Sequence, residues 1–228
     1  LGMTVLGHKN TLPVTVDNMI HHTAAVVRGT ERALVVGDMP FMSYQPGIDL
    51  TLINAGRFVK EAGADAVKVE GGAERAELVA AVVGSGIPVM GHVGLRPQAV
   101  NVDGGFRAKG RTESERDIVL NEARAADEAG AFAIVIEGVA RDLADEITKA
   151  VSCPTIGIGA SASCDGQVLV TQDMLGLFDW APKFVRRYAD LRSEIDTALG
   201  QFAVDVRSRE FPGEAETYSL RKPEAKQP

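Results

Sequence analysis

EAGADAVKVE (residues 61–70) and EAGAFAIVIE (residues 128–137) are the two stretches that decide the fold. Each has the pattern of a helix end, a tight glycine turn and an apolar strand, and the strands end in Glu70 and Glu137. Repetition of one helix–turn–strand phrase is typical of chains built from repeated αβ units.

The same alternation continues on both sides of these stretches. The predicted strands are apolar throughout, as expected of strands buried on both faces of a parallel sheet, and they span residues 33–38, 66–70, 88–92, 133–137, 155–159 and 167–170. The predicted helices span residues 15–28, 49–62, 75–85, 112–129, 141–150 and 183–209. A doubly wound sheet and a (β/α)8 barrel both fit this order.

Polar residues that end the strands favour the barrel. Asp38, Glu70, His92 and Glu137 each occupy the last position of an otherwise apolar run, and parallel strands would bring all four to one mouth. The sequence shows six strands where a barrel has eight, so we expect the first two strands to be missing from this chain. We expect one barrel domain over residues 1–211 and a loose C-terminal tail over residues 212–228.

Composition excludes several classes of protein. The chain has 228 residues and a formal charge of −7, which argues against nucleic-acid or anionic-membrane partners. No apolar run approaches the ~18 residues of a membrane span. Cys153 and Cys164 form no CxxC motif, so neither a disulfide scaffold nor a zinc cluster is expected. These features indicate a cytoplasmic α/β protein.

Asp38, Lys68 and Glu70 are the candidate residues on two successive strands. Lys68 and Glu70 are two apart and so share one face of their strand. They fit either a site for an anionic substrate beside a metal or a plain internal ion pair. Asp38 has two possible roles: it caps a helix, or it supplies, together with Glu70, a pair of oxygen ligands for a hard cation such as Mg²⁺.

Glu137 and His92 are the candidates on the two following strands. A carboxylate at the end of so apolar a strand suits general acid/base work, although a buried structural glutamate fits equally well. His92 is suited to donating a hydrogen bond to substrate or to satisfying a backbone carbonyl. The long connection over residues 94–112 carries Arg107, Lys109 and Arg111, which fit an anionic substrate, a subunit contact or solvated loop charges.

Ten phrases in order along the chain resemble the ketopantoate hydroxymethyltransferase family. They are GHKNTLPVTVDNMIHHTAAVVRG, DMPFMSYQ, EAGADAVKVEGG, IPVMGHVGLRPQAVN, GGFRAKGR, GAFAIVIE, PTIGIGA, CDGQVLV, DMLGLF and PKFVRRYA. The resemblance implies a (β/α)8 barrel of the phosphoenolpyruvate mutase type that assembles as a homodecamer. It also implies transfer of a hydroxymethyl group from 5,10-methylenetetrahydrofolate to 3-methyl-2-oxobutanoate, giving 2-dehydropantoate for pantothenate and coenzyme A biosynthesis.

The resemblance also assigns roles to the candidate residues. It implies that Asp38 and Glu70 bind Mg²⁺, that Asp38 and Lys68 touch the keto acid with His92 beside them, and that Glu137 is the catalytic acid/base. In the family a Gly-Asp-Ser phrase precedes the point at which this chain begins, and its Asp is a further metal ligand. Two alternatives are therefore an inactive fragment and another Mg²⁺-dependent keto-acid lyase or mutase on the same barrel, although the loop GGFRAKGR lacks the Cys or extra acids such enzymes carry.

Overall fold

The structure is a computed structural model that describes residues 1–219. Its contacts divide the chain into two compact units, Leu1–Leu169 and Val170–Pro228. The first unit contains strands and helices, and the described part of the second contains helices. No helix of the described part is long and apolar enough to cross a membrane.

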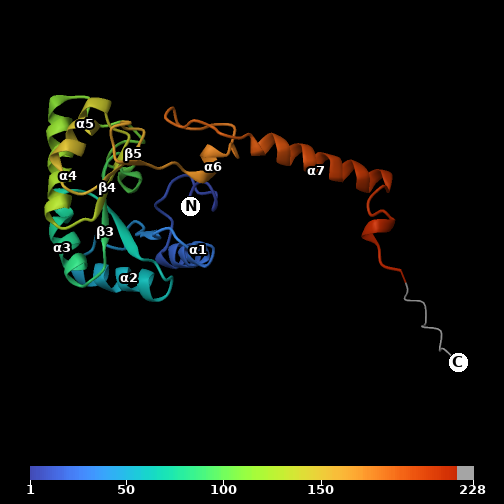
Figure 1. The fold of residues 1–228 in the computed structure, drawn as a ribbon, viewed down its shortest axis with the longest axis horizontal. Coiled ribbons are helices and arrows are strands. Elements are labelled where there is room, and N and C mark those ends of the chain that lie inside the picture. The colour runs from blue at the N-terminus through green and yellow to red at the C-terminus, as the bar shows by residue number, and fades with distance from the viewer. Residues whose placement is uncertain (220–228) are drawn as a thin grey trace. The chain divides into compact units, whose positions relative to one another are not determined.

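A six-stranded parallel sheet forms the centre of the first unit (Figure 1). Its strands are β1 (Val36–Asp38), β2 (Ala66–Glu70), β3 (Val89–Gly94), β4 (Ala133–Glu137), β5 (Thr155–Ile158) and β6 (Gly166–Gln167). Each strand pairs with the next one along the chain, and every pair is parallel. This order is that of a partial (β/α) barrel, which confirms the predicted fold class.

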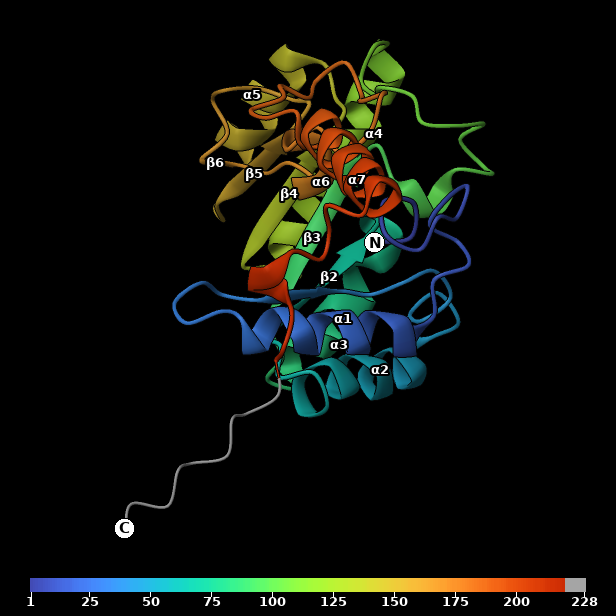
Figure 2. The ribbon, with the colours of Figure 1, turned by 90° about the vertical axis from the view of Figure 1, so that its right-hand side faces the viewer.

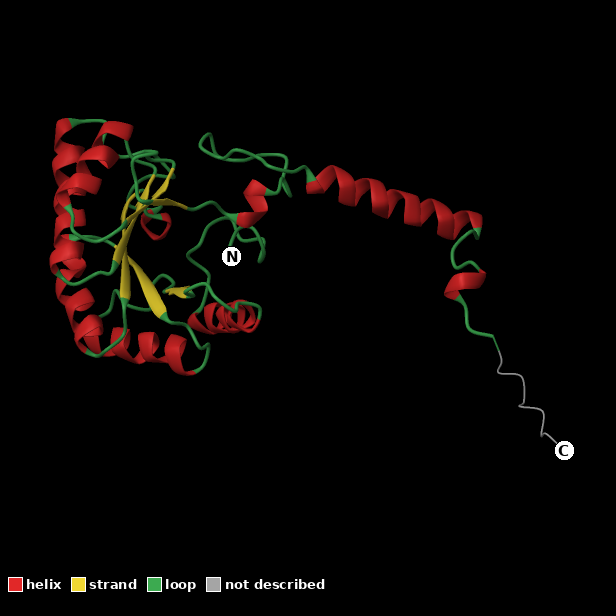
Figure 3. Cartoon of the chain, in the orientation of Figure 1, coloured by secondary structure: helices red, strands yellow, loops and turns green. Residues whose placement is uncertain are grey.

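Helices alternate with these strands and cover one face of the sheet (Figures 1 and 3). They are α1 (Val16–Arg28), α2 (Ile48–Lys60), α3 (Ala76–Gly84), α4 (Glu113–Glu128) and α5 (Arg141–Ala150), with short 3₁₀ turns η1 (Ala73–Arg75) and η2 (Pro97–Ala99). Thr15 caps α1 by accepting a hydrogen bond from the Asn18 N–H, and Thr112 caps α4 in the same way. The five helices predicted between residues 15 and 150 are therefore present within two residues at each end.

Side chains alternate between the two faces of the sheet. On the helix-covered face, Val67, Val69, Ile134 and Ile136 join the main core. On the other face, Met90, Val135 and Ile158 form a smaller apolar layer, and polar residues follow this layer towards the carboxyl ends of the strands. Figure 2 shows the strands side by side from this open direction.

The first and last strands are shorter than the sequence predicts. Residues 33–35 lie outside β1 because Val35 bonds to Asp65 instead: its N–H donates to Asp65 Oδ2 at 2.8 Å and its carbonyl accepts from the Asp65 N–H at 2.9 Å. The last strand ends at Gln167 because the Val168 N–H, which donates to the Gly157 carbonyl, makes the final bond to β5.

The second unit contains α6 (Thr171–Met174), α7 (Leu191–Ser208) and the 3₁₀ turn η3 (Glu214–Glu216). The helix predicted from residue 183 begins eight residues later, because the N–H groups of Tyr188 and Leu191 donate to the carbonyls of Met174 and Leu175 rather than along a helix. The predicted tail over residues 212–228 includes η3, and its part beyond residue 219 lies outside the described residues.

Candidate active site

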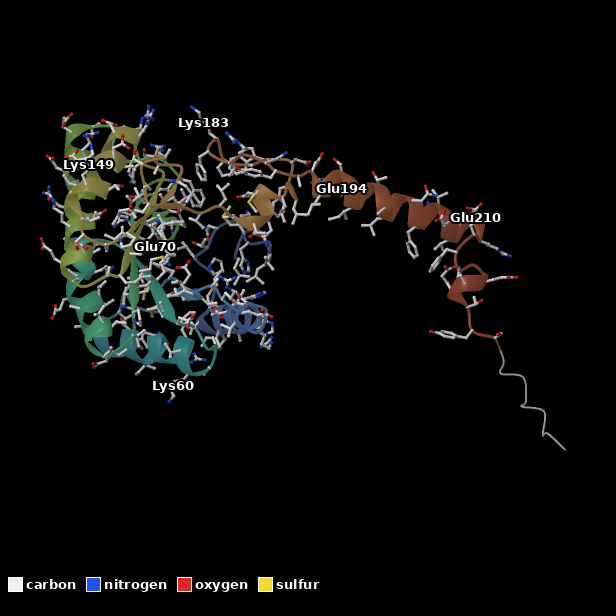
Figure 4. All side chains as sticks on the ribbon, viewed as in Figure 1. Lys60, Glu70, Lys149, Lys183, Glu194 and Glu210 are labelled. Carbon is white, nitrogen blue, oxygen red and sulfur yellow. The ribbon has the colours of Figure 1, made fainter. Side chains whose placement is uncertain are left out.

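All five predicted site residues lie on the open face of the sheet, at or near the carboxyl ends of four neighbouring strands. The register places Asp38 beside Lys68, Glu70 beside His92, and Gly94 beside Glu137. Figure 4 shows Glu70 inside the first unit, whereas Lys60 and Lys149 point outward from it. Parallel pairing therefore gathers residues that are up to 99 positions apart in the sequence into one cluster.

Lys68 and His92 connect the cluster. Lys68 Nζ lies 2.8 Å from Asp38 Oδ1 and 3.2 Å from His92 Nδ1. His92 Nδ1 lies 3.8 Å from Glu70 Oε1, and His92 Nε2 lies 3.2 Å from Glu137 Oε2. The His92 side chain is 2% exposed and that of Glu70 5%, whereas Asp38 at 44% faces the opening.

Lys68 keeps its charge in this setting. Burial by itself would lower its pKa, but the carboxylates of Asp38 and Glu70 outweigh burial and raise the pKa above its ordinary value. A charged ammonium can only donate a hydrogen bond, so His92 Nδ1 accepts from it and the imidazole proton lies on Nε2. The Nε2–H group faces Glu137 but makes no aligned hydrogen bond to any described residue. It is therefore a buried donor that a ligand could use.

The structure decides between two of the alternatives left open by the sequence. Lys68 does form an ion pair, but with Asp38 of the neighbouring strand rather than with Glu70 on its own strand. Asp38 caps no helix, since the next helix, α2, begins after Gly47. His92 contacts the charged side chains of Lys68, Glu70 and Glu137, and its part in substrate binding stays a prediction.

Burial is the main influence on Glu70. It raises the pKa of the carboxyl group, and the negative charge of Asp38 adds to this effect, while the positive charge of Lys68 opposes it. Glu70 Oε2 accepts a hydrogen bond from the backbone N–H of Gln98 at 3.0 Å. The other oxygen, Oε1, faces His92.

Asp38 and Glu70 fit a hard divalent cation. Asp38 Oδ1 is buried and has no aligned hydrogen bond although Lys68 Nζ is close, and an oxygen of this kind is a suitable ligand. The described residues contain no group of three or more His, Cys, Asp or Glu side chains arranged around a common point. Two carboxylates suit Mg²⁺, which keeps several waters and takes substrate oxygens as its other ligands.

Gly94 brings β3 and β4 together beside Glu137. It has φ +93°, and a Cβ atom there would lie 2.3 Å from the Glu137 carbonyl oxygen. That carbonyl accepts a hydrogen bond from the Leu95 N–H at 2.8 Å. Only glycine allows this approach, so Gly94, two residues beyond the predicted strand end, helps to place the predicted acid/base.

The long connection over residues 94–112 lies against the end of β4. The Lys109 N–H donates to the Gly138 carbonyl, and the Lys109 carbonyl accepts from the Ala140 N–H. The Lys109 ammonium pairs with Asp103 at 2.9 Å, whereas Arg107 and Arg111 are exposed. The positive charge of Lys109 is therefore paired with a carboxylate of the same loop.

Tyr44 and Gln98 belong to the site and were not singled out from the sequence. Both are buried, and both bond to Glu70. Neither lies in a strand, and no periodicity or motif marks a polar residue in a loop or a single 3₁₀ turn as buried. The phrases DMPFMSYQ and GLRPQ, in which they occur, were the available signals.

Comparison with known proteins decides the family. The sequence pattern of ketopantoate hydroxymethyltransferase matches residues 1–214. The chain belongs to the ketopantoate hydroxymethyltransferase family. A 3-methyl-2-oxobutanoate hydroxymethyltransferase from Hyphomonas neptunium (strain ATCC 15444) is 67% identical over 222 residues, which are 97% of this chain and 81% of that protein. One from Caulobacter vibrioides (strain NA1000 / CB15N) is 60% identical over 98% of this chain and 81% of its own length.

Solved structures show the same fold with little sequence likeness. A candidate phosphonomutase from Burkholderia cenocepacia J2315 has a TM-score of 0.52 at 18% identity, covering 90% of this chain and 81% of its own. A phosphonopyruvate hydrolase has a TM-score of 0.50 at 14% identity, covering 96% and 76%. These neighbours support the barrel of the phosphoenolpyruvate mutase type that the family resemblance implies.

Proposed function

We propose that this protein transfers a hydroxymethyl group from 5,10-methylenetetrahydrofolate to 3-methyl-2-oxobutanoate, giving 2-dehydropantoate for pantothenate and coenzyme A biosynthesis. The observation that carries the proposal is the continuous contact path from Asp38 through Lys68 and His92 to Glu137 at one mouth of the sheet. The homodecameric assembly and the cytoplasmic location expected from the sequence are part of the same proposal.

Asp38 and Glu70 would hold Mg²⁺ in this proposal. A bound Mg²⁺ supplies positive charge that stabilises the enolate form of the keto acid and so makes the C3 proton more acidic. Lys68 lies beside Asp38, with its Nζ 2.8 Å from Asp38 Oδ1, and its ammonium group would bind the substrate carboxylate.

Glu137 would take the C3 proton onto a carboxylate oxygen. The buried Nε2–H of His92 faces the same oxygen and would hold the carboxylate or a substrate oxygen in place. Water adds to the methylene carbon of the iminium form of the folate, and the carbon–nitrogen bond breaks to release formaldehyde and tetrahydrofolate. The electron pair left on C3 then bonds to the formaldehyde carbon, and the alkoxide oxygen that forms takes the proton back from Glu137, giving the hydroxymethyl product.

The test is formation of 2-dehydropantoate from the two substrates by the purified protein, with Mg²⁺ and with a chelator. Glu137→Gln should lower turnover by about 10²–10⁴-fold, because the variant cannot accept the proton, and should leave the fold intact. Glu128→Gln is the matched control, since Glu128 opens the same sequence phrase and is exposed at the end of α4.

Two results would contradict the proposal. Near-normal turnover by Glu137→Gln would remove Glu137 from the catalytic role. Cleavage or rearrangement of a keto acid without any folate-dependent product would favour a lyase or mutase on the same barrel.

A further inference from the structure

A buried hydrogen-bond network lies behind Glu70 and centres on the side chain of Gln98. Gln98 Nε2 donates to the Met39 carbonyl at 2.8 Å. Gln98 Oε1 accepts from the Tyr44 hydroxyl at 2.8 Å and from Gln45 Nε2 at 3.0 Å. The Met39 carbonyl needs a donor and Gln45 Nε2 needs an acceptor, so the contacts fix the orientation of the Gln98 amide.

Two members of this network bond directly to Glu70. The backbone N–H of Gln98 donates to Glu70 Oε2 at 3.0 Å, and the Tyr44 hydroxyl oxygen accepts from the Glu70 N–H at 3.2 Å. The Glu70 carbonyl lies 3.3 Å from the same hydroxyl, but the single phenolic proton favours Gln98 Oε1 at 2.8 Å. Tyr44 therefore connects the strand end of Glu70 to the amide of Gln98.

The network has two consequences for the strand ends. Because Glu70 Oε2 accepts the Gln98 N–H, Oε1 is the Glu70 oxygen that faces His92 within the cluster. Because Met39 directly follows Asp38, the Gln98 side chain also ties the end of β1 to the loop that holds Glu70.

We propose that Tyr44 and Gln98 are positioning residues that fix the two carboxylates of the cation site, with Glu70 held so that a single oxygen faces the ion. This proposal rests on the proposed function, because it assumes that Asp38 and Glu70 bind a divalent cation. Removing such outer partners of a ligand commonly weakens metal binding by about 10–100-fold.

The chain offers a closely matched control. Ser43 is the neighbour of Tyr44 and is 2% exposed, and its hydroxyl donates to the Pro40 carbonyl at 2.7 Å. Ser43→Ala and Tyr44→Phe each delete one buried hydroxyl from the same loop. Only Tyr44→Phe removes a group that bonds to Glu70 and Gln98.

The experiment is titration of the purified protein with Mn²⁺ as the probe, with free Mn²⁺ followed by electron paramagnetic resonance. We expect the Kd of Mn²⁺ to rise about 10–100-fold in Tyr44→Phe and in Gln98→Met, and to stay unchanged in Ser43→Ala. Turnover of both site variants should recover at saturating Mg²⁺, because their site is weakened and not removed. Gln98→Met keeps the backbone N–H on Glu70 and decides the question if Tyr44→Phe does not fold.

Each contrary outcome has its own meaning. Unchanged Mn²⁺ affinity in the site variants, or an equal loss in Ser43→Ala, would overturn the positioning role while leaving the proposed function in place. Failure of the unsubstituted protein to bind Mn²⁺ would overturn the cation site itself, and the positioning role with it.

Discussion

Lys68 is the residue whose charge has the clearest structural support. Its ammonium group lies 2.8 Å from Asp38 and 3.2 Å from His92, and nearby carboxylates raise its pKa despite burial. A fixed positive charge at the mouth of the sheet suits the carboxylate of a small keto acid.

Lys68→Met keeps the aliphatic stem but removes this charge. We expect calorimetry to show that the Kd of 3-methyl-2-oxobutanoate rises about tenfold to a hundredfold, because a charged hydrogen bond is lost. The Kd of tetrahydrofolate should change much less. Lys60→Met is the control, since Lys60 is exposed at the end of α2 and points away from the cluster. Equal losses for both ligands would show that Lys68 has only a structural role.

Five site residues could be predicted at this scale because their polarity contrasts with the apolar strands that carry them. Asp38 and Glu137 interrupt runs of aliphatic residues, and parallel pairing then dictates that they meet. Tyr44 and Gln98 could not be predicted, because their burial depends on where the loop after β1 meets the 3₁₀ turn η2. The roles of all seven residues remain predictions.

Asp127 joins two elements of the first unit. It lies in the last turn of α4 and accepts hydrogen bonds from the Ser152 N–H at 2.8 Å and the Cys153 N–H at 3.1 Å, just before β5. Partial burial by itself would raise the pKa of Asp127, but the bonds from Ser152 and Cys153 outweigh it and lower the pKa.

Asp127→Asn should lower the free energy of unfolding by about 1–2 kcal/mol near neutral pH. Because the folded-state pKa is lowered, the stabilisation by Asp127 is present above its ordinary pKa and is lost as the pH falls through the lowered value. The difference between the two proteins in urea unfolding should therefore shrink towards about pH 3. Asp117→Asn, at an exposed position of the same helix, is the control. A difference that persists unchanged into acid would exclude the charge as its cause.

The helices of the first unit were predicted best among the elements. Thr15 and Gly29 bound α1 as expected, and α5 spans residues 141–150 as predicted although no side chain caps it. Predictions were less accurate at the sheet edges, where β1 begins three residues late because Asp65 satisfies Val35. A side chain thirty residues away decided that boundary, and a local pattern does not reveal such a contact.

The first unit as a whole is a six-stranded part of a barrel whose polar mouth lies at the carboxyl ends of β1 to β4. Its apolar inner layer around Met90, Val135 and Ile158 lies below this mouth and keeps the polar cluster at one end. The arrangement places Glu137, the Lys68 ammonium group and the carboxylates of Asp38 and Glu70 around one opening. Removal of a proton from a carbon beside a keto group is the chemistry that it suits best.

Exchange of the C3 proton of 3-methyl-2-oxobutanoate with solvent deuterium, followed by proton NMR without folate, tests this central claim most directly. We predict that the purified protein exchanges the proton with Mg²⁺ present, that a chelator stops the exchange, and that Glu137→Gln slows it by about 10²–10⁴-fold while Glu128→Gln does not. Exchange at an unchanged rate in Glu137→Gln would contradict the assignment of this cluster as the site of enolisation.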